Sequence, residues 1–120
     1  MFSENFGVCC EQLAQMCPGI EGAVFADADG LIVASWGELA GDAAAAAAAQ
    51  LVRSIAQNLS LIQESELDDA LMWSSSGIWY CLRLRASGHA LLIRAAAKCR
   101  SGALRMAVNS LRQVLSQSEP

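Results

Sequence analysis

The sequence predicts an α+β fold in which helices cover one antiparallel sheet. Apolar residues recur at helical spacing in three segments of this 120-residue chain, and short apolar runs bounded by turn residues lie between them. Two such runs follow the first helical segment and three follow the second, so the order is α-β-β-α-β-β-β-α. The strands follow one another without intervening helices, which excludes a doubly wound nucleotide-binding fold. The length fits a single domain over 1–120.

The first helix is predicted from an amphipathic pattern near the start of the chain. Its apolar residues, spaced by alternating four and three, are Phe2, Phe6, Cys9, Leu13 and Met16. Pro18 disfavours helical geometry at the residue before it, and Gly19 then permits a turn. We therefore expect the helix to end just before Pro18.

A β-hairpin is predicted next. The segments 20–26 and 31–36 are apolar and rich in branched or aromatic residues, and they flank Asp27-Ala28-Asp29-Gly30. Gly30 readily adopts the positive φ that a tight connection requires. The same acidic residues resemble the start of a calcium loop, but apolar residues occupy the later ligand positions, so we expect no calcium.

The second helix starts near Gly41 and Asp42 and opens with seven consecutive alanines, Ala43 to Ala49. Asp42 either caps this helix or complements the positive end of its dipole. The apolar stripe continues through Val52, Ile55, Leu59 and Ile62. Alanine keeps helical order with the smallest apolar side chain, so another backbone can pack closely against this helix.

Three more strands and a last helix complete the pattern. The strands are predicted over 67–74, 78–85 and 89–97, with turns at Ser75-Ser76-Gly77 and Ala86-Ser87-Gly88. In the middle strand, a period of two places Ile78 and Tyr80 on one face and Trp79 and Cys81 on the other. The last helix is predicted from a stripe of Leu104, Val108, Leu111 and Leu115.

Composition limits the possible functions. The net charge of -4 argues against nucleic-acid binding, and a hydrophobic fraction of 54% leaves apolar surface for a homodimer. Five cysteines without C-x-x-C spacing and a single histidine, His89, predict reduced thiols without a metal site or disulfide framework. We expect no catalytic residues, no cofactor, no membrane insertion and a cytoplasmic location, so the chain is not predicted to be an enzyme.

Two segments of the sequence are distinctive: Cys17-Pro18-Gly19-Ile20-Glu21-Gly22-Ala23 and the hairpin segment 27–34. Together with the alanine-rich helix and the element order, they resemble the Roadblock/dynein light chain family. The resemblance covers about residues 2–117, and the short single-domain form is similar to the bacterial branch of the family. It implies a five-stranded antiparallel sheet between one long helix and two others, as in profilin-like folds.

The resemblance also implies a homodimer in which the third strand and the long second helix pair across a two-fold axis. The expected interface residues are Ala43, Ala46, Ala47, Gln50, Leu71, Met72 and Trp73. Family members are non-catalytic and bind or regulate small Ras-like GTPases. The expected partner-binding residues are Trp36, Glu38, Arg53 and Gln57.

Two alternatives to a GTPase regulator remain open at this stage. Roadblock-like dimers also act as scaffolds in signalling or motor complexes without sensing a nucleotide. Helices on a five-stranded antiparallel sheet also describe PAS-like and profilin-like sensors of small ligands, because a fold does not fix a function. The sequence has no phosphate-binding loop of its own, so any effect on GTP hydrolysis must act on a partner's catalytic groups.

Overall fold

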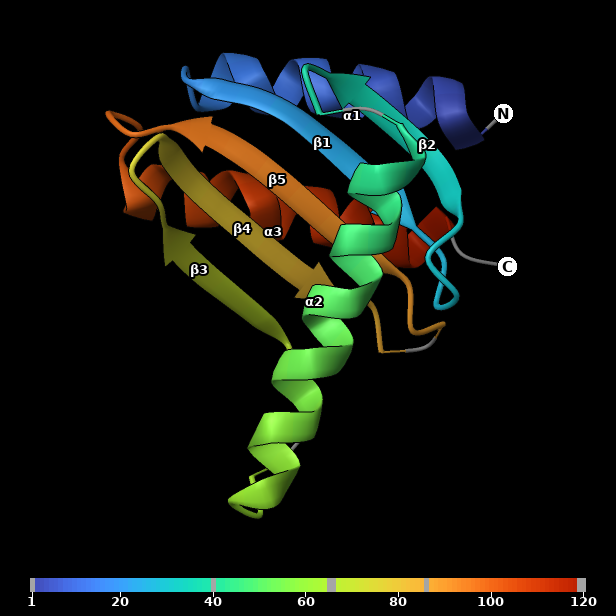
Figure 1. The fold of residues 1–120 in the computed structure, drawn as a ribbon. Coiled ribbons are helices and arrows are strands. Elements are labelled where there is room, and N and C mark those ends of the chain that lie inside the picture. Colours follow the sequence, from blue (N-terminus) through green and yellow to red (C-terminus); the bar gives the residue numbers. More distant parts are fainter. Residues whose placement is uncertain (1, 40, 65–66, 86, 119–120) are drawn as a thin grey trace.

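The computed structural model describes residues 2–39, 41–64, 67–85 and 87–118, and it confirms the predicted order of elements. The elements are α1 (Phe2–Met16), β1 (Ile20–Ala26), β2 (Ile32–Gly37), α2 (Asp42–Leu61), β3 (Asp69–Trp73), β4 (Gly77–Arg83), β5 (Ala90–Ala96) and α3 (Ser101–Ser118). The strands form one twisted sheet, with α2 in front of it and α1 and α3 behind it (Figure 1).

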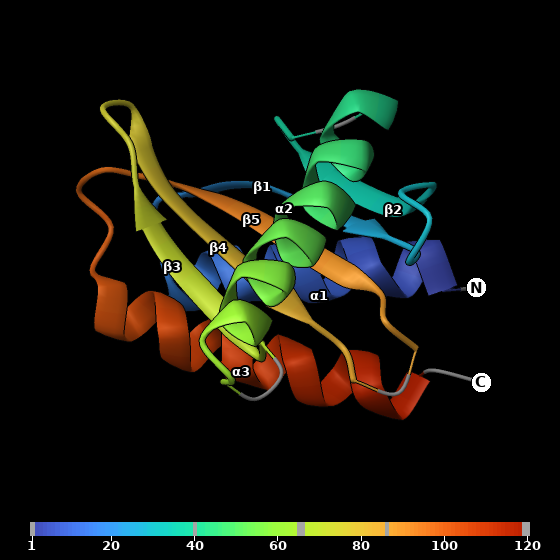
Figure 2. The same ribbon diagram turned by 60° about the horizontal axis from the view of Figure 1, so that its bottom comes forward.

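All neighbouring strands are antiparallel, and the strand order across the sheet is β2-β1-β5-β4-β3. Helices α1 and α3 cover one face, and α2 crosses the opposite face (Figure 2). Strands β2 and β3 are the two edges. This confirms the predicted α+β class with a five-stranded sheet between helices. Among the described residues, no helix is both long and apolar enough to cross a membrane.

The face under α1 and α3 is packed with large side chains. Because side chains alternate along a strand, Ile78, Tyr80 and Leu82 of β4 all point into this layer and are buried. They meet residues from both helices and the neighbouring strands, among them Phe6, Leu13, Phe25, Leu91, Ile93, Leu104, Val108, Leu111 and Leu115. The stripe predicted for the last helix therefore faces the core. In the first helix Phe6 and Leu13 are buried and Cys9 is partly buried, but Met16 is 59% exposed at the end of the helix, and the side chain of Phe2 lies outside the described residues.

The face under α2 is packed with small side chains. The buried residues of the helix are Ala45, Ala48, Ala49 and Val52. They pack on Val24, Ala26, Cys81, Ala90 and Leu92 of the sheet. Gly41 occupies the cap position without a side-chain cap bond, and Asp42 lies in the first turn. Of the two roles considered for Asp42, the structure therefore supports complementing the helix dipole.

Element boundaries differ from the sequence prediction by one or two residues. The third strand begins at Asp69 because Leu67 leaves the sheet and its side chain is buried in the α2 layer. The fourth strand begins one residue early, at Gly77, and ends at Arg83. The fifth covers Ala90–Ala96, one residue shorter at each end than predicted. Predicted turn residue Ala86 lies outside the described residues.

Candidate protein interface

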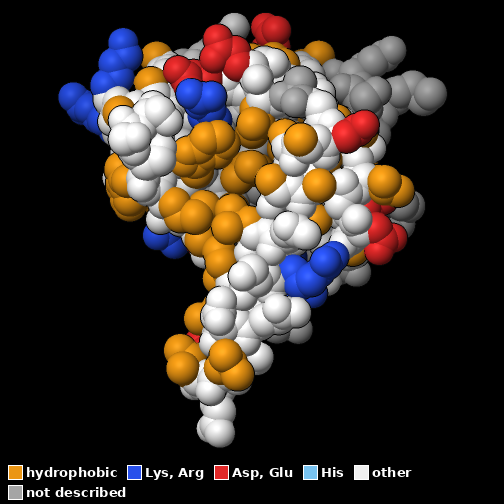
Figure 3. Space-filling view, in the orientation of Figure 1, with side chains coloured by type: hydrophobic (Ala, Val, Ile, Leu, Met, Phe, Trp, Pro, Cys, Tyr) orange, Lys and Arg blue, Asp and Glu red, His pale blue; other side chains and the backbone are white. Residues whose placement is uncertain are grey.

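An apolar surface lies on the sheet between α2 and β3. The backbone of α2 comes close to β1, β2, β4 and β5 but not to β3, so the sheet beside it is only partly covered. Partly buried apolar side chains from both sides define this surface, which we name the α2–β3 strip: Ala44, Leu51 and Ile55 of α2, Ala70 and Met72 of β3, and Trp79 of β4. Figure 3 shows hydrophobic side chains gathered over this part of the sheet.

One flank of α2 supplies the helix residues of the strip. Leu51 and Ile55 are four residues apart, so they share one flank of the helix. Arg53 is two residues from each of them, which is more than half a turn around the helix, so it lies on the opposite flank. The C-terminal end of α2 extends past the sheet (Figure 1). Leu61, its last residue, is 80% exposed, and Ile62, which follows, is 73% exposed. Apolar side chains thus continue along α2 to its end.

Strand β3 borders the strip and is an edge of the sheet. It pairs with β4 on one side only, so its outer backbone groups are available to another strand. The start of β3 is fixed by Asp69, whose Oδ2 accepts hydrogen bonds from the Tyr80 hydroxyl at 2.7 Å and from Arg112 at 2.8 Å. This cluster ties the edge strand to β4 and α3.

The Asp69 cluster shifts two pKa values. Burial acts to raise the pKa of Asp69, but the hydrogen bonds from Tyr80 and Arg112 and the positive charge of Arg112 outweigh it, so the pKa is lowered. Burial and the hydrogen bond to Asp69 raise the pKa of Tyr80 to about 12. Asp69 is therefore ionised and Tyr80 protonated near neutral pH.

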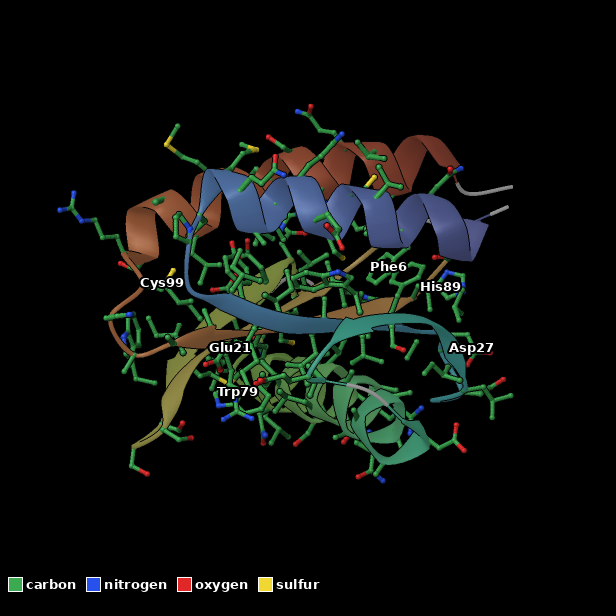
Figure 4. The ribbon with its side chains drawn as sticks, turned by 90° about the horizontal axis from the view of Figure 1, so that it is seen from above. Phe6, Glu21, Asp27, Trp79, His89 and Cys99 are labelled. Atoms are coloured by element: carbon green, nitrogen blue, oxygen red, sulfur yellow. The ribbon has the colours of Figure 1, made fainter. Side chains whose placement is uncertain are left out.

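Trp79 is held in place at the strip by polar neighbours. Its indole Nε1 donates to Ser74 Oγ at 3.2 Å, and the Arg94 guanidinium lies 5.5 Å from the ring centroid. Arg94 Nε is 3.1 Å from Glu21 Oε1, an ion pair without hydrogen-bond alignment. A register shift between Ile20 and Gly22 accompanies the placement of Glu21 on this face. Figure 4 shows Glu21 and Trp79 on the same side of the sheet.

The predicted dimer residues do not share one surface. Ala43, Ala46, Ala47 and Gln50 are all exposed on α2. Met72 belongs to the strip, and Trp73 is 64% exposed at the end of β3. Leu71 packs instead against the α1/α3 layer, because neighbouring strand residues point to opposite faces. The dimer interface itself stays a prediction.

Ala46 also contacts a loop of its own chain. A side-chain carbon at Gly30 would lie 3.4 Å from the Ala46 Cα, so the hairpin turn runs close against the helix backbone. Gly30 has φ +89°, the positive value expected for this turn. Part of the alanine run is therefore needed for packing within the chain.

Two of the four predicted partner-binding residues lie together. Arg53 and Gln57 line a hollow of about 350 Å³ beside α2, together with Arg83 and Gly88. Arg53 donates a hydrogen bond to the Ala28 carbonyl oxygen at 2.9 Å and remains exposed. The hollow thus combines two guanidinium groups with an amide, a set suited to carboxylate or carbonyl oxygens of a partner.

Trp36 and Glu38 lie elsewhere. Trp36 packs on the α1/α3 core and lines a separate hollow with Val8 and Gln12 of α1. Glu38 is exposed after β2, where its backbone N–H donates to the Glu21 carbonyl oxygen at 2.9 Å. The four residues therefore do not form one site.

The interface residues expected from the sequence do not include the strip residues Leu51, Ile55 and Trp79, although Ile55 was placed in the apolar stripe of the second helix and Trp79 on one face of its strand. Two signals were available for them. Ala44, Leu51 and Ile55 form a second apolar stripe beside the buried one, and period-two alternation puts Trp79 on the α2 face with Cys81.

Comparisons with solved structures identify the fold. Myxococcus xanthus MglB is similar with a TM-score of 0.83 and 16% identity, over 94% of this chain and 93% of that one. A Roadblock/LC7 domain from Streptomyces avermitilis has a TM-score of 0.71 and 24% identity, over 91% of this chain and 96% of that one.

The gliding protein MglB from Thermus thermophilus has a TM-score of 0.80 and 13% identity, over 96% of this chain and 88% of that one. No family model matches the sequence, and no curated protein matches it. The structural similarity extends over nearly the whole chain in each case. The chain therefore has the Roadblock/LC7 fold, and the resemblance stated from its sequence is confirmed at the level of the fold.

Proposed function

We propose that this chain is a non-catalytic, cytoplasmic homodimer that binds a small Ras-like GTPase and modulates its activity or localisation. The α2–β3 strip carries the proposal. It combines partly exposed apolar side chains with an open edge strand, and both features favour association with a second protein surface. Structures with the same fold include an MglB described with a tetrameric arrangement, so this fold supports assembly.

A two-fold axis beside β3 explains the dimer in physical terms. In an isologous contact, β3 of each copy meets β3 of the other, and the two α2 flanks meet across the same axis. The open N–H and C=O groups of β3 gain partners, and Leu51, Ile55 and Met72 lose contact with water. Leu61, the last residue of α2, and Ile62, its C-cap, add exposed apolar side chains at the end of the helix.

The hollow beside Arg53 is the proposed contact for the GTPase. It lies on the flank of α2 opposite to the strip, so a dimer through the strip leaves it open. Arg53 and Arg83 offer donors to acidic or carbonyl groups of the partner. The chain has no phosphate loop, so it acts by positioning the partner's own catalytic groups or by holding the partner in place.

A capture experiment tests the proposal. The protein is immobilised and incubated with lysate of its source cells, once with a non-hydrolysable GTP analogue and once with GDP, and bound proteins are identified by mass spectrometry. We expect a small Ras-like GTPase, enriched with the GTP analogue. Equal recovery with both nucleotides identifies an adaptor that does not sense the nucleotide. Absence of any GTPase from both eluates contradicts the proposal.

Variants locate the contact. Arg53→Ala should reduce GTPase recovery at least several-fold, because a partly desolvated charged contact is worth about 1.5–3 kcal/mol. Arg100→Ala is the control, since Arg100 is also exposed but precedes α3, on the opposite layer of the molecule. Equal losses for the two variants would show that the hollow is not the contact.

A further inference from the structure

Two cysteines from distant parts of the sequence meet inside the α1/α3 layer. Cys17 follows α1 and Cys99 precedes α3, and their Sγ atoms are 3.0 Å apart. Cys17 is 2% exposed and Cys99 7% exposed. Figure 4 shows Cys99 at the start of α3, beneath the C-terminal end of α1. The two thiols therefore face each other with no residue between them.

The backbone around the pair fixes this arrangement. The Ala96 N–H donates to the Gly19 carbonyl oxygen at 2.7 Å, which joins the turn after α1 to the turn after β5. Gly19 has φ +112°, and a side-chain carbon there would lie 3.4 Å from Cys99 Cβ. Glycine thus allows the close approach. A disulfide requires the two sulfurs to approach to about 2.05 Å. The two sulfur atoms therefore need to move together by about 1 Å, and the two turns stay joined.

A small oxidant has access to the pair. Cys17 and Cys99 both line a hollow of about 380 Å³, together with Pro18, Lys98 and Arg100. The other buried thiols differ, because Cys10 and Cys81 are 0% exposed. A small oxidant therefore reaches Cys17 and Cys99 more readily than Cys10 and Cys81.

We propose that Cys17 and Cys99 are a modification site at which hydrogen peroxide forms a reversible intramolecular disulfide. Cys99 Sγ attacks one peroxide oxygen, the O–O bond breaks, and sulfenic acid and water form. Cys17 Sγ then attacks the Cys99 sulfur, the S–O bond breaks, and the hydroxyl group leaves with the Cys17 proton as water. In total, two thiols and one peroxide give one disulfide and two waters.

The order of the two steps follows from the environments of the thiols. Burial and the hydrogen bond with Cys99 raise the pKa of Cys17 to about 12, so Cys17 stays protonated near neutral pH. The more exposed Cys99 is therefore oxidised first, and Cys17 resolves it. The bond would join the end of α1 to the start of α3, on the face of the sheet opposite to the α2–β3 strip. It tightens one layer without involving the proposed interface.

Peptide mapping tests the proposal directly on the wild-type protein. The protein is treated with hydrogen peroxide, unfolded in the presence of an alkylating agent, digested and analysed by mass spectrometry. We expect a linked pair of peptides containing Cys17 and Cys99, with the loss of two hydrogen atoms, which separates again on addition of dithiothreitol. Cys10 and Cys81 should remain fully alkylated. Recovery of Cys17 and Cys99 as separate alkylated peptides after peroxide would overturn the proposal.

Variants test the order of the steps. In Cys17→Ser the resolving thiol is absent, so Cys99 should accumulate as sulfenic acid that dimedone traps. Cys9→Ser is the control and should still form the disulfide, because Cys9 lies on α1 away from the pair. Trapping at Cys9 in place of Cys99 would contradict the assignment. Circular dichroism checks the fold of each variant, and the wild-type map stands even where a variant does not fold.

Discussion

The sheet is packed with large side chains on the face of α1 and α3 and with small ones on the face of α2. On the first face, two helices bury aromatic and branched residues such as Phe6, Phe25 and Leu104. On the second face, a single helix places alanines on Val24, Ala26 and Ala90, and Trp79 and Met72 stay partly exposed. The apolar area removed from water within one chain is therefore greater on the first face.

This difference assigns different roles to the two layers. The α1/α3 layer supplies most of the stability of the single chain, because its large side chains are fully buried. The α2 layer keeps a helix close to the sheet and leaves apolar surface beside it, which is the requirement for an interface. Substitutions in the α1/α3 layer should therefore mainly lower the free energy of unfolding, whereas substitutions at the apolar surface beside α2 should mainly weaken assembly.

The largest loss of stability is expected from Phe25→Ala. The Phe25 side chain is 2% exposed, and its ring stacks on Phe6 with centroids 6.0 Å apart. Removing the ring leaves a cavity and should lower the free energy of unfolding by about 3–5 kcal/mol in urea titrations. Val52→Ala in the α2 layer removes only two methyl groups and should cost less. An equal or larger cost for Val52→Ala would refute the comparison of the two layers.

A smaller loss is expected from Asp69→Asn, which weakens the tie between β3 and α3. The lowered pKa of Asp69 means that its charged form stabilises the folded protein above the unfolded pKa of about 3.9. This contribution is lost as the pH falls through the still lower folded pKa. Asp69→Asn should therefore cost about 1.5–3 kcal/mol at pH near 7, and the difference from wild type should shrink in acid.

The neighbouring residue provides a control for this effect. Asp68 also forms an ion pair, with Arg85 at 2.7 Å, but the two side chains are 52% and 64% exposed. Exposed ion pairs contribute little to stability because water and salt screen them. Asp68→Asn should leave the urea midpoint nearly unchanged at every pH. A pH-independent effect of Asp69→Asn would show that its charge is not the cause.

A third change, Gly22→Ala, tests how α2 is seated on its face. A side-chain carbon at Gly22 would contact the backbone nitrogen of Leu39 and lie 2.8 Å from Leu39 Cβ. The segment leading into α2 must then shift, at a cost of about 1–3 kcal/mol in thermal or urea unfolding. Gly7→Ala on α1 meets nothing within 4 Å and should stabilise by about 0.5–1 kcal/mol. Loss of stability in both variants would point to a general intolerance of the fold.

Local patterns were sufficient to predict the elements. Period-two alternation in β4 correctly placed Ile78 and Tyr80 in the core, and the Pro18-Gly19 signal correctly ended α1 at Met16. Strand ends were less predictable. Leu67 belongs to an apolar run that is typical of a strand, but its side chain packs under α2 instead. Such tertiary packing is not visible in local spacing.

The site was harder to predict because it depends on how helices are rotated and on contacts between distant residues. Arg53 and Gln57 were both expected to bind a partner, and the fold brings them together at one hollow beside α2. The sequence does not state which flank of α2 faces β3, so exposed alanines were chosen and Leu51 was missed. Cys17 and Cys99 are separated by 82 positions, and their contact arises only from the fold.

The central claim is that the α2–β3 strip is the dimer interface, and sedimentation velocity with Ile55→Asp tests it most directly. We expect wild type at twice the 12.7 kDa chain mass at micromolar concentration. Ile55→Asp should sediment as a monomer, because the dimer would bury an unpaired charge. Gln57→Asp, on the opposite flank of the same helix, should remain a dimer. Circular dichroism confirms that each variant is folded. A wild-type mass of 12.7 kDa at all concentrations, or an unchanged dimer in folded Ile55→Asp, would contradict the account.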